Sequence, residues 1–295
     1  MDEEVYKKYK LAGSIAAKAR DYGANLVKAG KTLLEVAEKV EKKIEELGGK
    51  PAFPVNISIN DVAAHFTPKK KDLTKFQPGD VVKIDVGVHI DGYIADTATT
   101  VEVETDRYGE LIDASREALE NAIKTIKAGI RLREIGKIIS ETIKKRGYRA
   151  IDNLSGHNLQ RYLLHAGLSI PNVPEFSLTK LDADEVIAVE PFATDGVGHV
   201  ISGKESNIYR LVKFLPKSRD KTRIYAGKLR KLYSTLPFAE RWLEGKFTNP
   251  HNLLEDLVRK GYVISYSQLI EKGRGMVSQH EHTVIVTEEG CEVIT

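Results

Sequence analysis

Apolar side chains recur at helical spacing in the opening part of the chain. The spacing runs from Val5 to Val27 and resumes after Gly30, from Thr32 to Leu47. Thr32 has the side chain of a helix N-cap, and Gly48-Gly49 follows the second run as a stop signal. The pattern therefore predicts two consecutive helices before the first strand.

The pattern then changes to β-branched residues without a helical period. Pro51–Asn60 predicts an extended segment leading to His65, and Pro78-Gly79 predicts a turn. The next stretch, Val82–Thr97 (VKIDVGVHIDGYIADT), has two β-rich runs on either side of Asp91-Gly92. Both of these turn residues tolerate the positive φ of a two-residue loop. We therefore expect a β-hairpin.

This hairpin would place two aspartates on one face. With a two-residue loop, Ile90 faces Tyr93 and Asp85 faces Ala98, which makes Asp96 the diagonal neighbour of Asp85. The surrounding positions are apolar. Two buried carboxylates repel each other, so either one of them holds a proton or a cation neutralises both. The alternative is a surface hairpin with both aspartates in water.

Helical spacing returns in the middle of the chain, from Tyr108 to Ala128 and from Leu132 to Arg146. Short β-like runs follow at Ala150–Leu154, Leu163–Ile170, Val186–Val189, Met276–Val286 and Cys291–Ile294. Helices that flank antiparallel hairpins favour an α+β architecture over a doubly wound one.

The segment from Ser202 to Gly273 has a different character. Between Lys213 and Lys231 it holds eight lysines or arginines and one acid, Asp220. Helix-like runs follow at Lys228–Leu243 and Leu253–Lys260. We interpret residues 202–273 as an inserted helical subdomain, and residues 1–201 with 274–295 as the main domain. A charge run of this kind forms either a solvated face or a contact with nucleic acid.

Composition limits the class of protein. The 295 residues, 41% apolar and 29% charged, are typical of a soluble globular chain. A net charge of +3 is too small to indicate a nucleic-acid partner by itself. Cys291 is the single cysteine, which excludes an internal disulfide and fits a reducing compartment. The first residues lack a signal-peptide core and no stretch is long enough to span a membrane, so we expect a cytoplasmic protein.

Two glutamates stand among apolar residues of β-like runs in the second half of the chain. Glu190 ends the run VIAVE, and Pro191 after it cannot continue a ladder. Glu281 lies in QHEHTVIV, where alternation places His280 and His282 together on the opposite face. The two histidines could chelate a metal, but we favour Glu281, because a further carboxylate facing the aspartates suits an oxygen-ligated cation.

Three histidines are also candidates for chemistry. His157 follows Ser155-Gly156, His165 lies in LLHAGLSIPN, and His65 lies in AAHFTP. A histidine considered alone is more often structural than catalytic, so these positions gain meaning only in combination.

In combination, the motifs are specific. The residues NISIN–AAHFTP, KIDVGVHIDGYIADT, SGH, HAGLSIPN, VEPFAT and EHTVIV occur in this order. Together they resemble the methionine aminopeptidases over essentially the whole chain. The later segment with TLPFAERWL is similar to the insertion of the type II branch, here in the short archaeal form. The resemblance implies an α+β "pita-bread" fold, with an insertion in its catalytic domain.

The resemblance also implies a centre of two divalent metal ions. Its ligands would be Asp85, Asp96, His157, Glu190 and Glu281. Four carboxylates carry about −4 and two dications supply +4, which balances the site. Cobalt, manganese, iron and zinc all suit carboxylates with one imidazole.

The activity implied is removal of the initiator methionine from nascent polypeptides whose second residue is small, by attack of a metal-activated water. Glu190 would move the proton, His165 would hydrogen-bond the scissile carbonyl, and His65 would lie on the leaving side. Phe53 and Leu164 would line the methionine pocket, to which Ile208 and Tyr209 could contribute. We expect a monomer, without a membrane partner, whose ribosome contact would be the basic run Lys213–Lys231.

Two alternatives share the fold. One is a proline-specific peptidase such as prolidase or aminopeptidase P, and the other is a non-catalytic protein that binds RNA or ribosomes. The five ligand-type residues argue against the second, and HAGLSIPN with TLPFAERWL argues against the first. One position departs from the family: His280 stands where an apolar residue, commonly Phe, precedes the ligand glutamate. We expect its side chain to turn away from Glu281.

Overall fold

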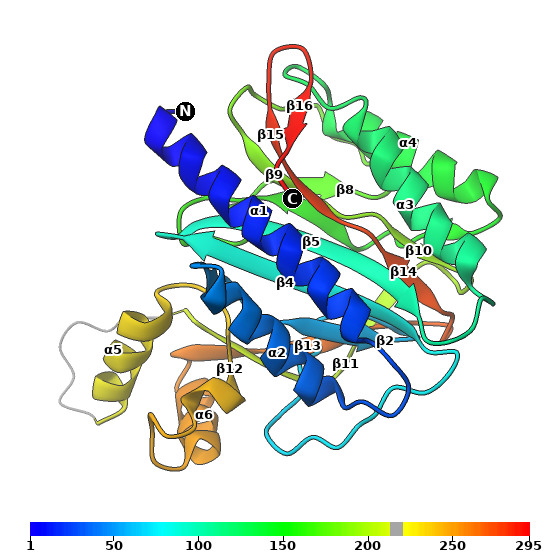
Figure 1. Cartoon of the computed structure of the whole chain (residues 1–295). Helices are drawn as coiled ribbons and strands as arrows, with labels where there is room; N and C mark the ends of the chain where they lie inside the picture. The colour runs from blue at the N-terminus through cyan, green and yellow to red at the C-terminus, as the bar shows by residue number, and fades with distance from the viewer. Residues whose placement is uncertain (213–220) are drawn as a thin grey trace.

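The two helices predicted at the start of the chain pack against the sheet that contains a long hairpin, and the first of them lies over the hairpin itself (Figure 1). The computed structural model describes residues 1–212 and 221–295. Helix α1 spans Glu3–Leu26 and α2 spans Leu33–Glu46. Thr32 is the N-cap of α2 and accepts a hydrogen bond from the Glu35 backbone N–H at 3.1 Å, while Gly48 after the helix has a φ of +89°. Both predicted boundaries are confirmed.

The hairpin has the predicted register. Strand β4 (Val81–Ile90) pairs with β5 (Tyr93–Glu102), with Ile90 opposite Tyr93 and Asp85 opposite Ala98. Asp91 and Gly92 have φ values of +51° and +91°, as a two-residue turn of this type requires. Strands β1 (Lys50–Pro51) and β2 (Asn56–Ile59) pair with the other edge of β4. The central strand of this sheet therefore carries Asp85.

The second half of the chain forms two further sheets covered by α3 (Gly109–Ile123) and α4 (Leu132–Lys145) (Figure 1). One sheet has the order β16-β15-β9-β7-β8 and the other β14-β10-β6. Their strands are β6 (Arg149–Ala150), β7 (Ser155–Asn158), β8 (Ser169–Pro171), β9 (Val186–Val189), β10 (Phe192–Thr194), β14 (Val277–Gln279), β15 (His282–Val286) and β16 (Cys291–Val293). Apolar residues of α3 and α4 pack against these strands as one core.

Three strand predictions are wrong in extent. The run Met276–Val286 is two strands, because Glu281 leaves the ladder and exchanges backbone hydrogen bonds with Ala98 of β5, at 3.0 and 3.3 Å. The run Ala150–Leu154 forms strand only at its first residue, and β7 begins after it. Most of Leu163–Ile170 is a loop, since the strand there begins only at Ser169.

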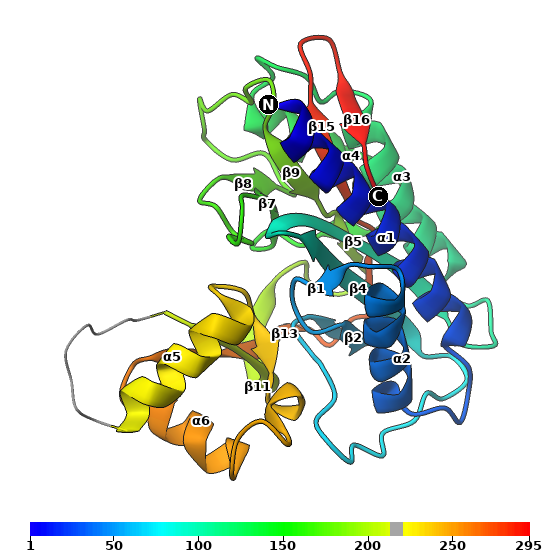
Figure 2. The same ribbon diagram turned by 60° about the vertical axis from the view of Figure 1, so that its left-hand side comes forward.

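The predicted insertion contains strands as well as helices. Strand β11 (Val200–Leu211) pairs with β13 (Val263–Glu271), and these join β3 (Val62–Ala64) and β12 (Phe238–Ala239) in a sheet of order β12-β11-β13-β3. Between them lie α5 (Lys221–Tyr233), the 3₁₀ helix η1 (Glu240–Leu243) and α6 (Pro250–Arg259). The helices α5 and α6 lie together at one end of the molecule in both views (Figures 1 and 2).

The predicted helix Lys228–Leu243 is therefore not continuous. It stops after Tyr233, because Ser234 has a φ of +56° and Pro237 follows shortly after. Residues 213–220 of the basic run lie outside the described part of the chain. The division into two domains stays a prediction. None of the helices in the described ranges is long and apolar enough to cross a membrane.

Candidate metal centre

Two glutamates lie where the chain passes from one sheet to the next. Glu190 falls between β9 and β10, and Glu281 falls between β14 and β15. The flanking pairs are in register: His282 opposes Val189 in one sheet, and Gln279 opposes Phe192 in the other. Both carboxylates are thus placed at the same crossing between sheets.

The structure brings all five predicted ligands to the wall of one pocket. Asp85 comes from β4, Asp96 from β5 and His157 from β7, and Glu190 and Glu281 come from the crossing. Asp96, His157 and Glu281 are buried, whereas Asp85 and Glu190 are partly exposed to the pocket itself. Residues from both halves of the chain are needed to form this cluster.

The separations within the cluster suit a shared cation. His157 Nε2 lies 3.7 Å from Asp96 Oδ2 and 3.6 Å from Glu190 Oε1, which is longer than a hydrogen bond. One ligand atom each of Asp96, His157 and Glu281 lies within 4.8 Å of the other two. Atoms that each lie roughly 2.0–2.6 Å from one cation have separations of this order.

The electrostatics of the cluster also fit a cation. Asp85 Oδ1, Asp96 Oδ1, His157 Nδ1 and Glu281 Oε1 are buried without a hydrogen-bond partner in the described residues. Burial raises the pKa of Asp85 to about 7. Burial, with repulsion from neighbouring carboxylates, raises the pKa values of Asp96, Glu190 and Glu281 well above the usual range. Burial lowers the pKa of His157 to about 3, which keeps its imidazole neutral and able to coordinate.

Threonine hydroxyls fix the backbone behind Asp96 and Glu281. Thr283 Oγ1 accepts from the Asp96 backbone N–H and donates to the Asp96 carbonyl, both at 2.7 Å. Thr97 Oγ1 donates to the Glu281 carbonyl at 2.7 Å and accepts from Arg20 at 2.6 Å. These bonds fix the backbone from which the two carboxylates project.

The rest of the pocket contains the predicted substrate residues and several others. The further lining residues, around a cavity of about 60 Å³, are Phe53, Asn56, Ala64, His65, Leu164, His165, Ile208, Pro237 and Tyr266. A Cβ at Gly87 would lie 2.1 Å from the Phe53 ring, so the absence of a side chain there lets Phe53 pack on β4. His65 has a φ of +61° and its ring meets Tyr266 edge-on at 5.3 Å.

The sequence interpretation missed part of this lining. Tyr209, offered as a contributor, packs on Phe238 in the insertion and does not line the pocket. Pro237 belongs to the TLPFAERWL motif, so its segment was indicated although the residue was not. Asn56 likewise belongs to a quoted motif, NISIN, and it opposes Asp85 in the β2–β4 register. Tyr266 lies outside all of the quoted motifs.

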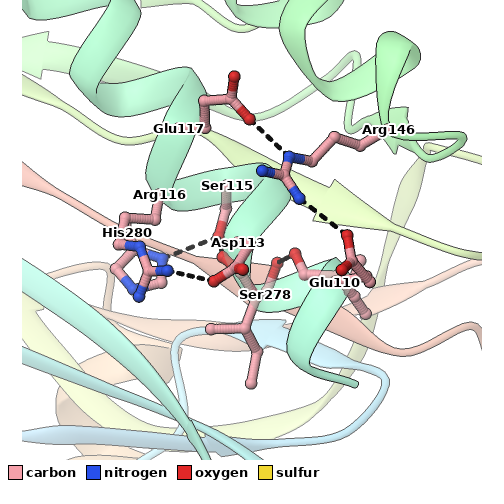
Figure 3. Close-up of polar contacts among 10 residues, drawn as sticks. Glu110, Asp113, Ser115, Arg116, Glu117, Arg146, Ser278 and His280 are labelled. Carbon is pink, nitrogen blue, oxygen red and sulfur yellow. Dashed lines mark hydrogen bonds and ion pairs between the residues drawn. The ribbon is translucent and has the colours of Figure 1, made fainter. Parts of the chain in front are cut away.

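His280 turns to helix α3. Its Nδ1 lies 2.8 Å from Ser115 Oγ, and Ser278 Oγ donates to the Leu111 carbonyl at 2.7 Å (Figure 3). His280 does not line the pocket. The polar residue at this position is therefore satisfied by α3.

Comparisons with known proteins place the chain in a family. Residues 7–288 match the model of metallopeptidase family M24. A methionine aminopeptidase of Pyrococcus horikoshii is 49% identical over 288 residues, 96% of this chain and 97% of the relative. One of Methanocaldococcus jannaschii is 47% identical over 100% of both chains. The chain belongs to metallopeptidase family M24. Within this family of hydrolases it is a homologue of the methionine aminopeptidases.

Solved structures of other proteins share the fold. A methionine aminopeptidase from Thermotoga maritima superposes with a TM-score of 0.74 at 26% identity, over 100% of this chain and 98% of the other. A thermophilic Arx1 gives 0.86 at 20% identity, with 100% and 91% covered, which shows the fold alone. A prolidase from Pyrococcus furiosus gives 0.65 at 21% identity, with 100% and 64% covered. The predicted α+β pita-bread fold is confirmed.

Proposed function

We propose that this chain removes the N-terminal methionine from polypeptides whose second residue is small. The observation that carries the proposal is the convergence of four carboxylates and one neutral imidazole on a single pocket with apolar walls. The close relatives named methionine aminopeptidase support it, since they cover nearly the whole chain.

In this proposal Asp85, Asp96, His157, Glu190 and Glu281 hold two divalent cations, of cobalt, manganese, iron or zinc. The buried oxygens without partners are the structural reason, because an unsatisfied buried acceptor costs about 1–3 kcal/mol. When bound, such cations lower the pKa of a water molecule and stabilise the negative charge that develops on a carbonyl oxygen.

Glu190 has a second role in this proposal, and the other residues of the pocket bind and orient the substrate. Glu190, partly exposed to the pocket, would carry the proton from the attacking water to the leaving amine. His165 would donate to the scissile carbonyl, and His65 would position the second residue. Phe53 and Leu164 would enclose the thioether, which a narrow apolar wall accepts well.

A direct test uses two tripeptides. We expect cleavage of Met-Ala-Ser by the metal-loaded protein and no cleavage of Ala-Pro-Ser, measured as release of the first amino acid by chromatography. Chelation with EDTA should stop the reaction, and added Mn²⁺ or Co²⁺ should restore it. Cleavage of the proline peptide alone would identify a proline-specific enzyme. Cleavage of neither peptide would favour the non-catalytic alternative.

We also propose that the protein is a monomer, acts on nascent chains in the cytoplasm, and contacts the ribosome through Lys213–Lys231. The charge run supports the ribosome contact, because lysine and arginine bind the phosphates of nucleic acids, in contacts that salt weakens.

Charge reversal at Lys217, Arg219 and Lys221 should therefore abolish co-sedimentation with ribosomes, and salt should weaken binding of the unmodified protein. Lys217 and Arg219 lie outside the described residues. Reversal at Lys137, Lys144 and Lys145 on the remote helix α4 is the matched control, which should bind as before. Unchanged binding after reversal in the basic run would refute the contact.

A further inference from the structure

A buried ion pair joins helix α2 to the insertion. Arg241 of η1 donates to Glu41 of α2, and each residue is only 9% exposed. Trp242 Nε1 donates to the second carboxylate oxygen of Glu41 at 2.9 Å. The other terminal nitrogen of the guanidinium, Nη1, donates to Thr67 Oγ1 at 2.8 Å and to the Pro68 carbonyl at 2.9 Å. One guanidinium thus ties three segments together.

The connections continue from this pair into two more segments. The Val55 backbone N–H donates to Glu41 Oε1 at 3.2 Å, and Thr67 Oγ1 donates to the Val55 carbonyl at 2.8 Å. The Thr67 backbone N–H donates to the Ser206 carbonyl at 3.2 Å, and Asn207 Nδ2 donates to the Thr67 carbonyl at 2.8 Å. Strand β11 and the segment before β2 are therefore bonded to the same cluster.

Each of these segments also contains a residue that lines the pocket. Phe53 lies just before Val55, His65 lies just before Thr67, and Ile208 directly follows Asn207. Pro237, which also lines the pocket, lies in the same motif as Arg241, TLPFAERWL, and the short strand β12 separates the two residues. Glu41 and Arg241 themselves do not line this pocket. The ion pair is outside the pocket, and it bonds directly to the backbone of Val55 and Pro68 and, through the Thr67 hydroxyl, to the segment that contacts β11.

Stability alone does not account for this arrangement. Replacing a buried ion pair by apolar residues of similar size is often neutral or stabilising, because the charges lose their hydration on burial. What apolar residues cannot reproduce is the fixed geometry of a forked guanidinium, which bonds several acceptors at set directions. The positions of the bonded segments are the property that depends on the pair.

We propose that the Glu41–Arg241 pair is a specificity-determining device that sets the width of the methionine pocket from outside it. The two residues act as positioning residues, through Phe53, His65, Ile208 and Pro237. This inference rests on the proposed function, since it assigns the selectivity of the same pocket. Without the pair, α2 and η1 would lose their direct bonds, and only the remaining contacts, such as those of Thr67 with Ser206 and Asn207, would set the separation of the two walls.

The test compares three variants. E41L/R241M removes both charges at similar volume, and R241K keeps the charge but loses the fork. K70A/E244A is the control: this exposed pair, at 2.8 Å, also joins the loop after His65 to the insertion. The measurements are kcat and KM for Met-Ala-Ser, norleucine-Ala-Ser and Leu-Ala-Ser, with metal content and melting temperature.

In both Arg241 variants we expect the preference for methionine over leucine in kcat/KM to fall about tenfold, the low end of what the shape of an apolar pocket supplies. The loss should appear mainly as a higher KM for the methionine peptide, with metal content unchanged. K70A/E244A should keep the ratio of the unmodified protein.

The proposal would be overturned if folded R241K and E41L/R241M kept a preference for methionine over leucine in kcat/KM within twofold of that of the unmodified protein. Equal losses for all three peptides would also overturn it, because they would indicate a purely structural role. If E41L/R241M does not fold, R241K alone decides. Failure of the unmodified protein to cleave Met-Ala-Ser would instead count against the proposed function.

Discussion

Replacing Glu281 by glutamine is expected to reduce hydrolysis of Met-Ala-Ser by more than the roughly 100-fold that loss of a residue behind a metal ligand costs. The change keeps the shape of the side chain but removes one of the four negative charges that two dications require. The fold should survive, because Glu281 is 1% exposed and burial disfavours its charged form. Activity, metal content by atomic emission and the melting temperature of the metal-free protein are the measurements.

The neighbouring residue provides the control for this variant. His280 is buried like Glu281 but contacts Ser115 of α3 and does not line the pocket. We therefore expect H280F to retain activity within about tenfold, below the 10- to 100-fold range of residues that orient metal ligands. If E281Q has full activity with normal metal content, Glu281 is not a ligand. The proposed ligand set would then be wrong, and each of the other four residues would need its own test.

The second large effect is a pH dependence of stabilisation by metal. A carboxyl group whose pKa is raised by folding contributes its full stabilisation of the metal-free fold when the pH is below the pKa that the group has in the unfolded chain. That pKa is 3.8 for aspartate. This contribution is lost as the pH rises through the folded value, which is about 7 for Asp85. The pKa values of Asp96, Glu190 and Glu281 are raised in the same direction, well above their usual range, by burial and by the neighbouring carboxylates. Between pH 6 and 8, metal binding must therefore displace protons from these groups.

The difference in melting temperature between Mn²⁺-saturated and EDTA-treated protein should accordingly widen from pH 6 to pH 8. Each proton released contributes about 1.4 kcal/mol of binding free energy per pH unit. The pKa of His157, about 3, means that it releases none in this range. Other buried groups, such as Lys83 with a pKa of about 7, titrate both in the metal-bound and in the metal-free protein. Their contributions therefore largely cancel in the difference in melting temperature.

Scanning calorimetry measures this difference, and titration calorimetry in buffers of different ionisation enthalpy counts the protons released. E281Q has one titrating group fewer and should show a smaller widening. A difference in melting temperature that stays constant across the range would contradict the raised pKa values of the carboxyl groups.

The hairpin of the metal centre could be predicted from sequence because its determinants are local. The Asp91-Gly92 turn fixes the register, and the register places Asp85 and Asp96 on one face. Alternation placed His280 and His282 on the face opposite Glu281, and the preference of an oxygen-ligated cation for a further carboxylate decided for Glu281. The structure places Glu281 in the pocket, with neither histidine lining it. That these residues hold metal stays a prediction.

What the sequence could not show depends on contacts between distant segments. The break between β14 and β15 arises because Glu281 bonds to Ala98, far earlier in the chain. Glu41 and Arg241 are 200 positions apart, and nothing in the local pattern around either residue indicates a partner. Alternation predicts which way a side chain points along a strand, but not where the strand itself stops.

The paired ends of the inserted segment have a further consequence. Val200 opposes Glu271 where β11 and β13 meet, so the chain leaves and returns at nearly the same place. The metal-binding candidates all lie outside residues 202–273, whereas Ile208, Pro237 and Tyr266 of the pocket lie within. Exchanging or reshaping this one segment would alter which side chain is admitted while leaving the hydrolytic groups untouched. Substrate preference could thus change independently of bond cleavage.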